Sequence, residues 1–253
     1  AKCTFCAFRR DGHEDDAYTL NYDTLLQKVQ GIVDIGGTQI LMQGGMNPDL
    51  PLEWYTDLLS LLGEKYPQVH VHAFSPPEVI EFVNFFDTPG NTLEEQTHFV
   101  LKELQAAGLH SIPGGGGEIF AHAVRKKIGL GKCNAEAWLT VMRVAHELGM
   151  NTSATMMFGH IEGIADRIHH MDLVRTWQER SIQDFGLNGG GRYSAFISWP
   201  FQPDNTPLGR VKEWTHGNSE LEIFPGDVVA KLDGSGHKSN HPEFGRRIRL
   251  AGS

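Results

Sequence analysis

Two cysteines near the amino end, Cys3 and Cys6, are separated by two residues. Two thiolates at this spacing can hold one metal centre from a tight turn, either zinc or an iron–sulfur cluster. Zinc would need two further ligands. His13 could supply one of them, whereas the third cysteine, Cys133, lies far along the chain. The spacing alone therefore leaves open a zinc site, an iron–sulfur site and a pair of cysteines with no metal.

The composition excludes several classes of protein. Lys and Arg number 22 against 31 Asp and Glu, which gives a net charge of −9, so we expect no nucleic-acid partner. No apolar stretch is long enough to span a bilayer. Three cysteines are too few for a disulfide framework and indicate a reducing, cytoplasmic location. The chain starts at Ala1 without a signal-peptide pattern, and we expect it to be a fragment, truncated at both ends.

Short apolar runs alternate with amphipathic stretches along the first 208 residues. This alternation predicts a parallel sheet built from βαβ units, either doubly wound or closed as a barrel. Helices are expected over residues 23–34, 93–107, 135–148 and 164–183, and another is expected to begin at 49–51, with Pro51 in its first turn, and to end at 66–67. The expected strands cover residues 38–42, 69–74, 109–112, 152–158 and 194–199.

Nearly every expected strand ends in a polar or glycine-rich cluster. The clusters cover residues 43–45, 75–78, 114–118 and 159–160, with Gln202 after the last strand. Polar residues at five successive carboxyl ends favour a (β/α) barrel, whose active sites lie on that face. From residue 209 the pattern fails, and we expect an irregular insertion over 209–245, followed at 246–253 by the start of a further barrel segment.

The glycine loop and a pair of histidines each have more than one interpretation. The glycine loop at 113–118 is expected to be flexible, and its backbone amides could hold a phosphate, which would make the chain an ordinary phosphate-binding barrel enzyme. Glu118 would repel a phosphate, which favours contact with a sugar hydroxyl, or it could simply face a helix N-terminus. His70 and His72 alternate with valines and so share one face of their strand. If that face is the barrel interior, His72 could bind substrate; the other interpretation is a buried, hydrogen-bonded core histidine.

Several longer motifs are similar to one family. The residues after Cys6, together with residues 36–45, 70–78, 111–118 and 154–162, resemble the menaquinone and deazaflavin branch of the radical S-adenosylmethionine (SAM) superfamily. Residues 196–208 are similar to the dehypoxanthine futalosine cyclases of that branch. The superfamily motif is C-x3-C-x2-C. Cys3 and Cys6 match its second and third cysteines, and the first would fall two positions before Ala1.

The resemblance implies a radical SAM barrel over residues 1–208 that carries a 4Fe–4S cluster and SAM. It implies a reductive cleavage of SAM, abstraction of hydrogen from ribose C4′ of dehypoxanthine futalosine, and closure onto the benzoate ring in menaquinone biosynthesis. The partners would be this small-molecule substrate and a one-electron donor such as flavodoxin or ferredoxin. With two of three cluster thiolates, residues 1–253 alone are expected to be inactive.

The same resemblance assigns roles to individual residues. Cys3 and Cys6 would ligate iron, and Phe5 would lie near the adenine of SAM. The cofactor would also contact Glu118 and the strand-end residues Gln43, Gly44 and Gly45. Polar and aromatic residues at the mouth would bind the substrate: His72, Ser75, Glu78, His160, Trp199, Gln202 and Asn205.

Some choices stay open at this point. The benzoate carboxylate needs a cation, and the sequence does not choose among Arg9, Arg125, Arg143 and Arg192. Two other members of the branch, aminofutalosine synthase and the deazaflavin synthase subunit, would use the same cofactors on a different acceptor. A zinc-binding domain without catalytic activity is the alternative from another class.

Overall fold

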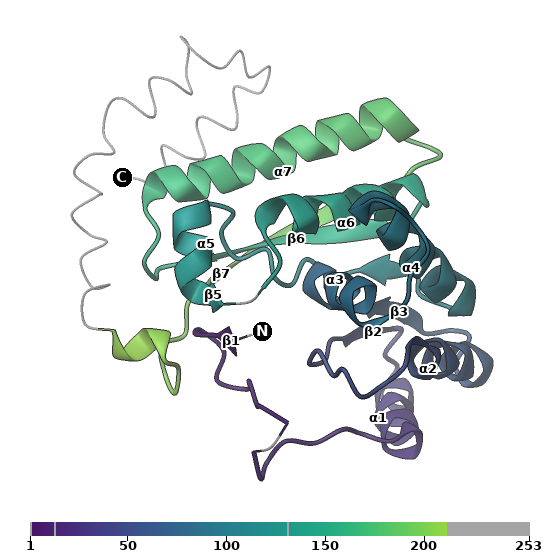
Figure 1. Cartoon of the computed structure of the whole chain (residues 1–253). Helices are drawn as coiled ribbons and strands as arrows, with labels where there is room; N and C mark the ends of the chain where they lie inside the picture. Colours follow the sequence, from purple (N-terminus) through teal and green to yellow (C-terminus); the bar gives the residue numbers. More distant parts are fainter. Residues whose placement is uncertain (1, 13, 131, 212–253) are drawn as a thin grey trace.

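The computed structural model describes residues 2–12, 14–130 and 132–211 (Figure 1). Seven helices are α1 (Tyr22–Asp34), α2 (Leu52–Lys65), α3 (Pro76–Phe85), α4 (Leu93–Ala107), α5 (His122–Ile128), α6 (Ala135–Glu147) and α7 (Ile164–Phe185) within this described part. The strands there are β1 (Lys2–Cys3), β2 (Gln39–Met42), β3 (His70–Ala73), β4 (Ser111–Ile112), β5 (Gly129–Leu130), β6 (Asn151–Phe158) and β7 (Tyr193–Pro200). A short 3-10 helix, η1 (Leu208–Arg210), follows β7.

Five parallel strands form one sheet in the order β2-β3-β4-β6-β7. Their spatial order follows the chain order throughout, so every crossover advances in the same direction. A doubly wound sheet would reverse direction at a switch point, whereas a barrel does not. The sheet is therefore a half-barrel, which confirms the predicted incomplete (β/α) barrel with about five strands.

The helices lie where their capping residues and apolar faces place them. Asn134 caps α6 by accepting a hydrogen bond from the amide of Ala137, as its position in the sequence indicates. Trp138, Met142 and Ala145 recur along one face of α6 and are fully buried. Similar faces of α2, α3 and α4 complete the core on the outer side of the sheet.

Some elements differ from the sequence prediction. Helix α2 begins at Leu52, so Pro51 occupies the N-cap position instead of the first turn. The sequence pattern predicts neither α3 nor α5, because residues 75–78 resemble a strand-end cluster and 119–128 have no clear period. The two-residue strands β1 and β5 pair antiparallel, with Cys3 opposite Gly129, and this contact between distant segments has no local sequence signal.

Two expectations concern membrane spans and the last segment. No helix in the described part of the chain is both long and apolar enough to cross a bilayer. Residues 212–253 lie outside the described residues, so the irregular insertion expected over 209–245 is covered only to residue 211, and the segment expected at 246–253 is not covered.

Candidate active site

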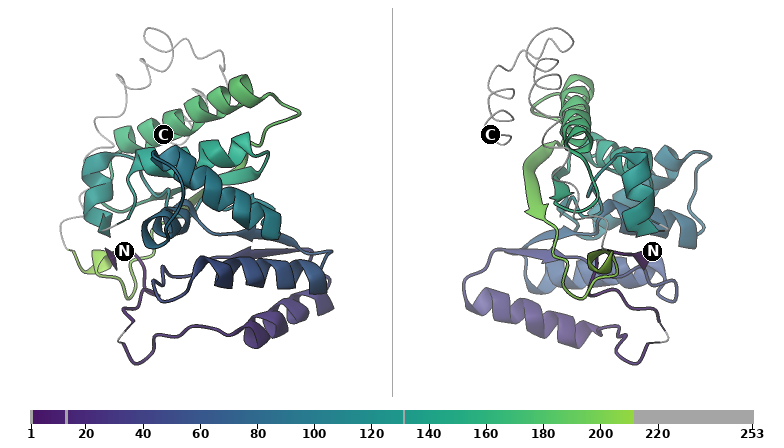
Figure 2. Two further views of the ribbon diagram at one scale, coloured as in Figure 1. Left: turned by 45° about the vertical axis from the view of Figure 1, so that its right-hand side comes forward. Right: turned by 90° about the vertical axis from the view of Figure 1, so that its left-hand side faces the viewer.

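The segment that carries Cys3 and Cys6 is fixed by backbone hydrogen bonds. The amide of Thr4 donates to the carbonyl of Ile128 at 2.9 Å, and the carbonyl of Thr4 accepts from the amide of Leu208 at 2.8 Å. The amide of Cys6 also approaches the carbonyl of Cys3 at 3.5 Å, which closes a turn between the two cysteines. Figure 2 shows the amino-terminal segment beside the short helix that follows β7. Segments far apart in sequence thus hold the cysteine turn in one place.

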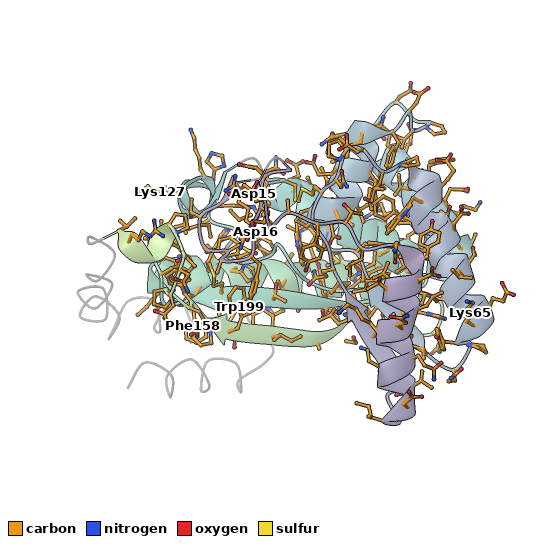
Figure 3. All side chains as sticks on the ribbon, turned by 90° about the horizontal axis from the view of Figure 1, so that it is seen from below. Asp15, Asp16, Lys65, Lys127, Phe158 and Trp199 are labelled. Atoms are coloured by element: carbon orange, nitrogen blue, oxygen red, sulfur yellow. The ribbon has the colours of Figure 1, made fainter. Side chains whose placement is uncertain are left out.

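Phe5, inside the cysteine turn, connects it to the carboxyl ends of the strands. Its ring lies 6.4 Å from that of Trp199, near the end of β7, and both pack against a second buried apolar cluster that includes Met156 and Met157. In Figure 3, Trp199 and Phe158 lie at the end of the sheet away from Lys65, which closes α2 before β3 begins. The cysteine turn is therefore at the carboxyl-end mouth, where barrel enzymes place their chemistry.

A buried ion pair lies beside this turn. The ammonium of Lys132 is 5.0 Å from the centre of the Phe5 ring and 2.9 Å from Oε1 of Glu118. The Lys132 and Glu118 side chains are only 11% and 6% exposed. The sequence predicts Glu118 as a site residue but not Lys132, which follows no motif and lies between two helices. The structure thus adds a cation to the predicted site.

Burial and charge act together on these groups. Burial raises the pKa of the Cys3 thiol, and the positive charge of Lys132 opposes part of that rise. Burial disfavours the charged form of Lys132, but the attraction of Glu118 and Cys3 outweighs it and raises the lysine pKa. The second carboxylate oxygen of Glu118, Oε2, is buried and has no hydrogen-bond partner among the described residues. The site therefore contains an acceptor that this part of the chain leaves unused.

Glu118 also has an unusual backbone conformation. Its φ is +33°, a region that residues with a Cβ rarely adopt and that costs about 1–3 kcal/mol. Asn205, a second predicted site residue, has φ +59°, although asparagine tolerates this region better than most residues do. Such strain concentrates at functional sites, which supports the assignment of Glu118 to the site.

The glycine loop is packed tightly, which corrects the expectation that it is flexible. A Cβ on Gly115 would lie 2.2 Å from Nε2 of Gln43, and one on Gly116, which has φ +84°, would lie 2.3 Å from Cγ of Pro77. The carbonyl of Gly115 accepts a hydrogen bond from the indole of Trp138 at 3.1 Å. The loop thus uses its glycines for close contact with the end of β2 and with α3, and its packing gives no support to a phosphate cradle.

Ser75 and Glu78 connect the ends of two neighbouring strands. Oε2 of Glu78 accepts from the amide and hydroxyl of Ser75 at 2.8 and 2.7 Å, and Oε1 accepts from the amide of Gly44 at 3.0 Å. Burial raises the pKa of Glu78, while these hydrogen bonds oppose the rise. In this structure the pair holds the Gly44–Gly45 turn in place, and contact with a substrate stays a prediction.

His160 is held by its own loop. Its Nε2 is 3.1 Å from the carbonyl of Met157, and its Nδ1 is 3.1 Å from Oε2 of Glu162. Arg167 pairs with the same glutamate at 2.6 Å. Burial lowers the pKa of His160, although Glu162 acts in the opposite direction. His160 therefore stabilises the turn after β6, and its predicted contact with substrate stays a prediction.

The remaining predicted residues lie around the mouth. Gln202 and Asn205 are exposed in the loop after β7, and Nε2 of Gln202 lies 3.4 Å from the carbonyl of Pro200. The structure therefore places Trp199 against the cysteine turn, whereas the side chain of Gln202 is directed to its own loop.

The four candidate arginines all have partners. Arg125 is buried and donates to the carbonyls of Gly117 at 3.0 Å and Cys133 at 2.7 Å, so it braces the glycine loop. Arg143 pairs with Glu94, Arg9 pairs with Asp11, and Arg192 reaches the carbonyl of Leu187 at 3.5 Å. The sequence analysis considered these four arginines as partners for a carboxylate but not Lys132, which lies directly beside the cysteine turn.

His70 and His72 share one face of β3, as predicted. Val71 and Ala73, on the opposite face, are 2% and 0% exposed within the core. The imidazoles therefore lie on the inner face of the half-barrel, and both contact the hydroxyl of Ser111 on β4, at 2.7 and 2.6 Å. The alternation with valines predicted that the two histidines share a face, whereas nothing in the sequence indicated that Ser111 contacts them.

The donor set gives no support to zinc. Among residues 2–12, 14–130 and 132–211, no group of three or more His, Cys, Asp or Glu side chains is arranged to hold a metal ion. Cys3 and Cys6 are free thiols in one turn, and His13 is outside the described residues. Among the described residues, Cys3 and Cys6 thus provide two of the four ligands of a closed tetrahedral zinc site, or two of the thiolates of an iron–sulfur cluster.

Comparisons with known proteins agree with this arrangement. The sequence model of the Radical SAM superfamily matches residues 1–174. The cyclic dehypoxanthine futalosine synthase of Halalkalibacterium halodurans is 39% identical over 213 residues, which are 84% of this chain and 53% of that protein. The aminodeoxyfutalosine synthase of Thermus thermophilus is 39% identical over 233 residues, 91% of this chain and 58% of that protein.

A third relative has a name that indicates a different activity. The 5-amino-6-(D-ribitylamino)uracil–L-tyrosine 4-hydroxyphenyl transferase of Methanopyrus kandleri is 36% identical over 231 residues, 91% of this chain and 58% of that protein. The chain thus spans little more than half the length of these relatives. Because the superfamily match covers more than half of the chain and includes the cysteine turn at the mouth of a half-barrel, this chain belongs to the radical SAM superfamily.

Proposed function

We propose that this chain is the radical-forming half-barrel of an enzyme that converts dehypoxanthine futalosine to its cyclic form in menaquinone biosynthesis. One observation carries the proposal: the turn that holds Cys3 and Cys6 lies at the carboxyl-end mouth, against the buried Lys132–Glu118 pair. The relative from Halalkalibacterium halodurans supports the choice of reaction. A (β/α) barrel builds its active site at this end, so the turn is where the chemistry belongs.

The residues of the mouth would hold a 4Fe–4S cluster and SAM. Cys3 and Cys6 would provide two of the cluster thiolates, and a third would come from outside the described residues. When bound, this group supplies a carbon radical that abstracts a hydrogen atom from the substrate. Oε2 of Glu118 has no partner among the described residues and is an acceptor suited to a ribose hydroxyl. The Gly44–Gly45 turn, fixed by Glu78, would expose backbone carbonyls to the methionine amino group.

The chain's own residues would orient the substrate and exclude water. Phe5 and Trp199 form an apolar wall beside the cysteine turn, while His72 lies on the inner face just below the rim. A reactive radical requires a target held in contact and a dry surrounding, and this wall contributes to both. A small one-electron donor such as flavodoxin or ferredoxin would supply the reducing electron.

A second reaction of the same branch is the main alternative. The Thermus thermophilus relative, an aminodeoxyfutalosine synthase, shares the same 39% identity over 233 residues, so the same mouth would serve another acceptor. The choice between them rests on substrate contacts. It does not rest on the cysteine turn or the Lys132–Glu118 pair.

The two reactions are separated by assay of the protein expressed from its complete coding sequence. After anaerobic reconstitution with iron and sulfide, the protein is incubated with SAM, a reductant and dehypoxanthine futalosine. The proposal predicts 5′-deoxyadenosine and the cyclic product together. Formation of 5′-deoxyadenosine without the cyclic product, and of product from the substrates of aminodeoxyfutalosine synthase, would favour the alternative.

A further inference from the structure

We propose that His72, Ser111 and His70 form a proton relay on the inner face of the half-barrel, in which Nε2 of His72 accepts the proton that leaves the substrate's aromatic ring. The inference rests on the proposed function, since it assigns residues to its last step. It concerns contacts between β3 and β4 that no other part of the site uses.

The relay consists of one hydroxyl between two imidazoles. Oγ of Ser111 lies 2.6 Å from Nδ1 of His72 and 2.7 Å from Nε2 of His70. A serine hydroxyl has a single proton, so it can donate to only one of these nitrogens, and the other nitrogen must carry its own N–H. The protonation states of the two histidines are therefore linked through Ser111.

The surroundings favour two neutral imidazoles. Burial lowers the pKa of His72, with His70 acting in the same direction, while a hydrogen bond to the backbone of Ser111 opposes this lowering. Partial burial of the His70 ring and the neighbouring His110 lower the pKa of His70 as well. Two neutral rings allow the hydrogen bonds to run in either direction, and the relay uses the one from Nδ1–H of His72 to the Ser111 hydroxyl and on to Nε2 of His70. In that arrangement Nε2 of His72 is a proton acceptor.

The position of the three residues suits transfer from the site to solvent. His72 pairs in register with Leu41 and Ser111, one residue below the ends of β2 and β3. His70 lies two residues further from the mouth and is exposed. Its ring stacks on that of His110, with 4.9 Å between centres, and Nδ1 of His110 accepts from the amide of Val71 at 3.0 Å. His70, at the end of the relay away from the mouth, is therefore held by His110 and exposed to water.

The proposed reaction needs such an acceptor. When the substrate's carbon radical adds to the benzoate ring, the ring keeps one hydrogen too many, and it regains aromaticity by losing one proton and one electron. The C–H bond breaks, its proton goes to Nε2 of His72, and the electron goes to a one-electron acceptor of the iron–sulfur class. The Nδ1 proton of His72 moves to Ser111, the Ser111 proton moves to His70, and His70 releases a proton to water.

The decisive experiment compares an early and a late product in the protein expressed from its complete coding sequence. 5′-Deoxyadenosine reports hydrogen abstraction, whereas the cyclic product also requires loss of the ring proton. We expect His72→Gln to lower the ratio of cyclic product to 5′-deoxyadenosine about 100-fold, the lower end of what general-base catalysis contributes, and Ser111→Ala, which keeps the base, to lower it about 10-fold. Ser111→Thr, which keeps a hydroxyl, should restore the ratio.

A control and a measurement without turnover complete the test. His169, exposed on α7, provides the control variant His169→Gln, which should leave the ratio unchanged. In the substrate-free protein, nitrogen-15 NMR of the imidazoles should show His72 protonated on Nδ1. An unchanged product ratio in a folded Ser111→Ala variant, or His72 protonated on Nε2, would overturn the relay. If the wild type makes no cyclic product, the proposed function fails and the assignment of the ring proton to His72 fails with it, whereas the NMR result still tests the direction of the hydrogen bonds through Ser111.

Discussion

The ammonium of Lys132 lies 2.9 Å from the carboxylate of Glu118, beside the cysteine turn, and the two side chains are only 11% and 6% exposed. A buried ion pair adds little net stability, but removal of one partner leaves the other charge without compensation. This pair therefore fixes the positions of the glycine loop and of Phe5 together, since Lys132 also lies over the Phe5 ring.

Removal of the Lys132 charge alone should destabilise the fold. We expect Lys132→Met to lower the free energy of unfolding by about 3–5 kcal/mol, because Glu118 would remain as an unpaired buried carboxylate. The double variant Lys132→Met/Glu118→Gln should recover most of this loss. Urea denaturation of the three proteins measures both effects. A single variant as stable as the wild type would show that the pair is not buried as described.

Substitution by alanine should have opposite effects on stability at a glycine of the tightly packed loop and at a glycine on the surface of α2. Gly114→Ala would place a Cβ 2.5 Å from the backbone carbonyl oxygen of Ser153, and we expect a loss of about 1–3 kcal/mol in unfolding free energy. Gly63 is exposed in α2, and a Cβ there would meet no neighbouring group within 4 Å, so Gly63→Ala should stabilise by about 0.5–1 kcal/mol. Thermal unfolding of both variants tests the sign, and stabilisation by Gly114→Ala would contradict the close contact.

Stability should depend on pH through His146. Burial lowers its pKa from 6.5 to about 4, and its two ring nitrogens contact Ser181 at 2.7 Å and Thr152 at 2.8 Å. Between these pH values the unfolded state binds more protons than the folded state, so stability falls as the pH falls from about 6.5 to 4. At about 1.4 kcal/mol per pKa unit, the full loss from this residue is about 3 kcal/mol.

The variant His146→Gln separates this contribution from others. Glutamine can keep one hydrogen bond to each partner but does not titrate, so the pH dependence should become shallower by one proton. His170, whose pKa burial lowers to about 3, should keep its own contribution. Denaturant titrations at pH 4 to 7 provide the comparison, and an unchanged slope in the variant would exclude His146 as its source.

The sequence predicted the parts of the fold that depend on local patterns. The helix expected over 135–148 forms as α6, because its bounds are set by local devices, the side-chain cap of Asn134 and the left-handed Gly149. Helix α3 was missed although Ser75 and Glu78 form a capping pair at its start, since two adjacent prolines are also typical of a turn. The order of the sheet then confirmed the barrel, which periodicity alone left open.

The site was predictable where spacing or alternation carries the signal. Cys3 and Cys6 follow from their spacing, and the shared face of His70 and His72 follows from alternation with valines. Lys132 and Ser111 could not be found this way, because each reaches the site only through a tertiary contact, with Glu118 in one case and with the two histidines in the other.

The assignment of the cysteine turn to an iron–sulfur and SAM site is tested most directly with three serine variants of the protein expressed from its complete coding sequence. After anaerobic reconstitution, the wild type and Cys133→Ser, whose thiol lies outside the turn, should show the brown absorbance of a 4Fe–4S cluster and release 5′-deoxyadenosine from SAM under reduction. Cys3→Ser and Cys6→Ser should show neither. Retention of cluster and SAM cleavage in either of these two variants would contradict the account.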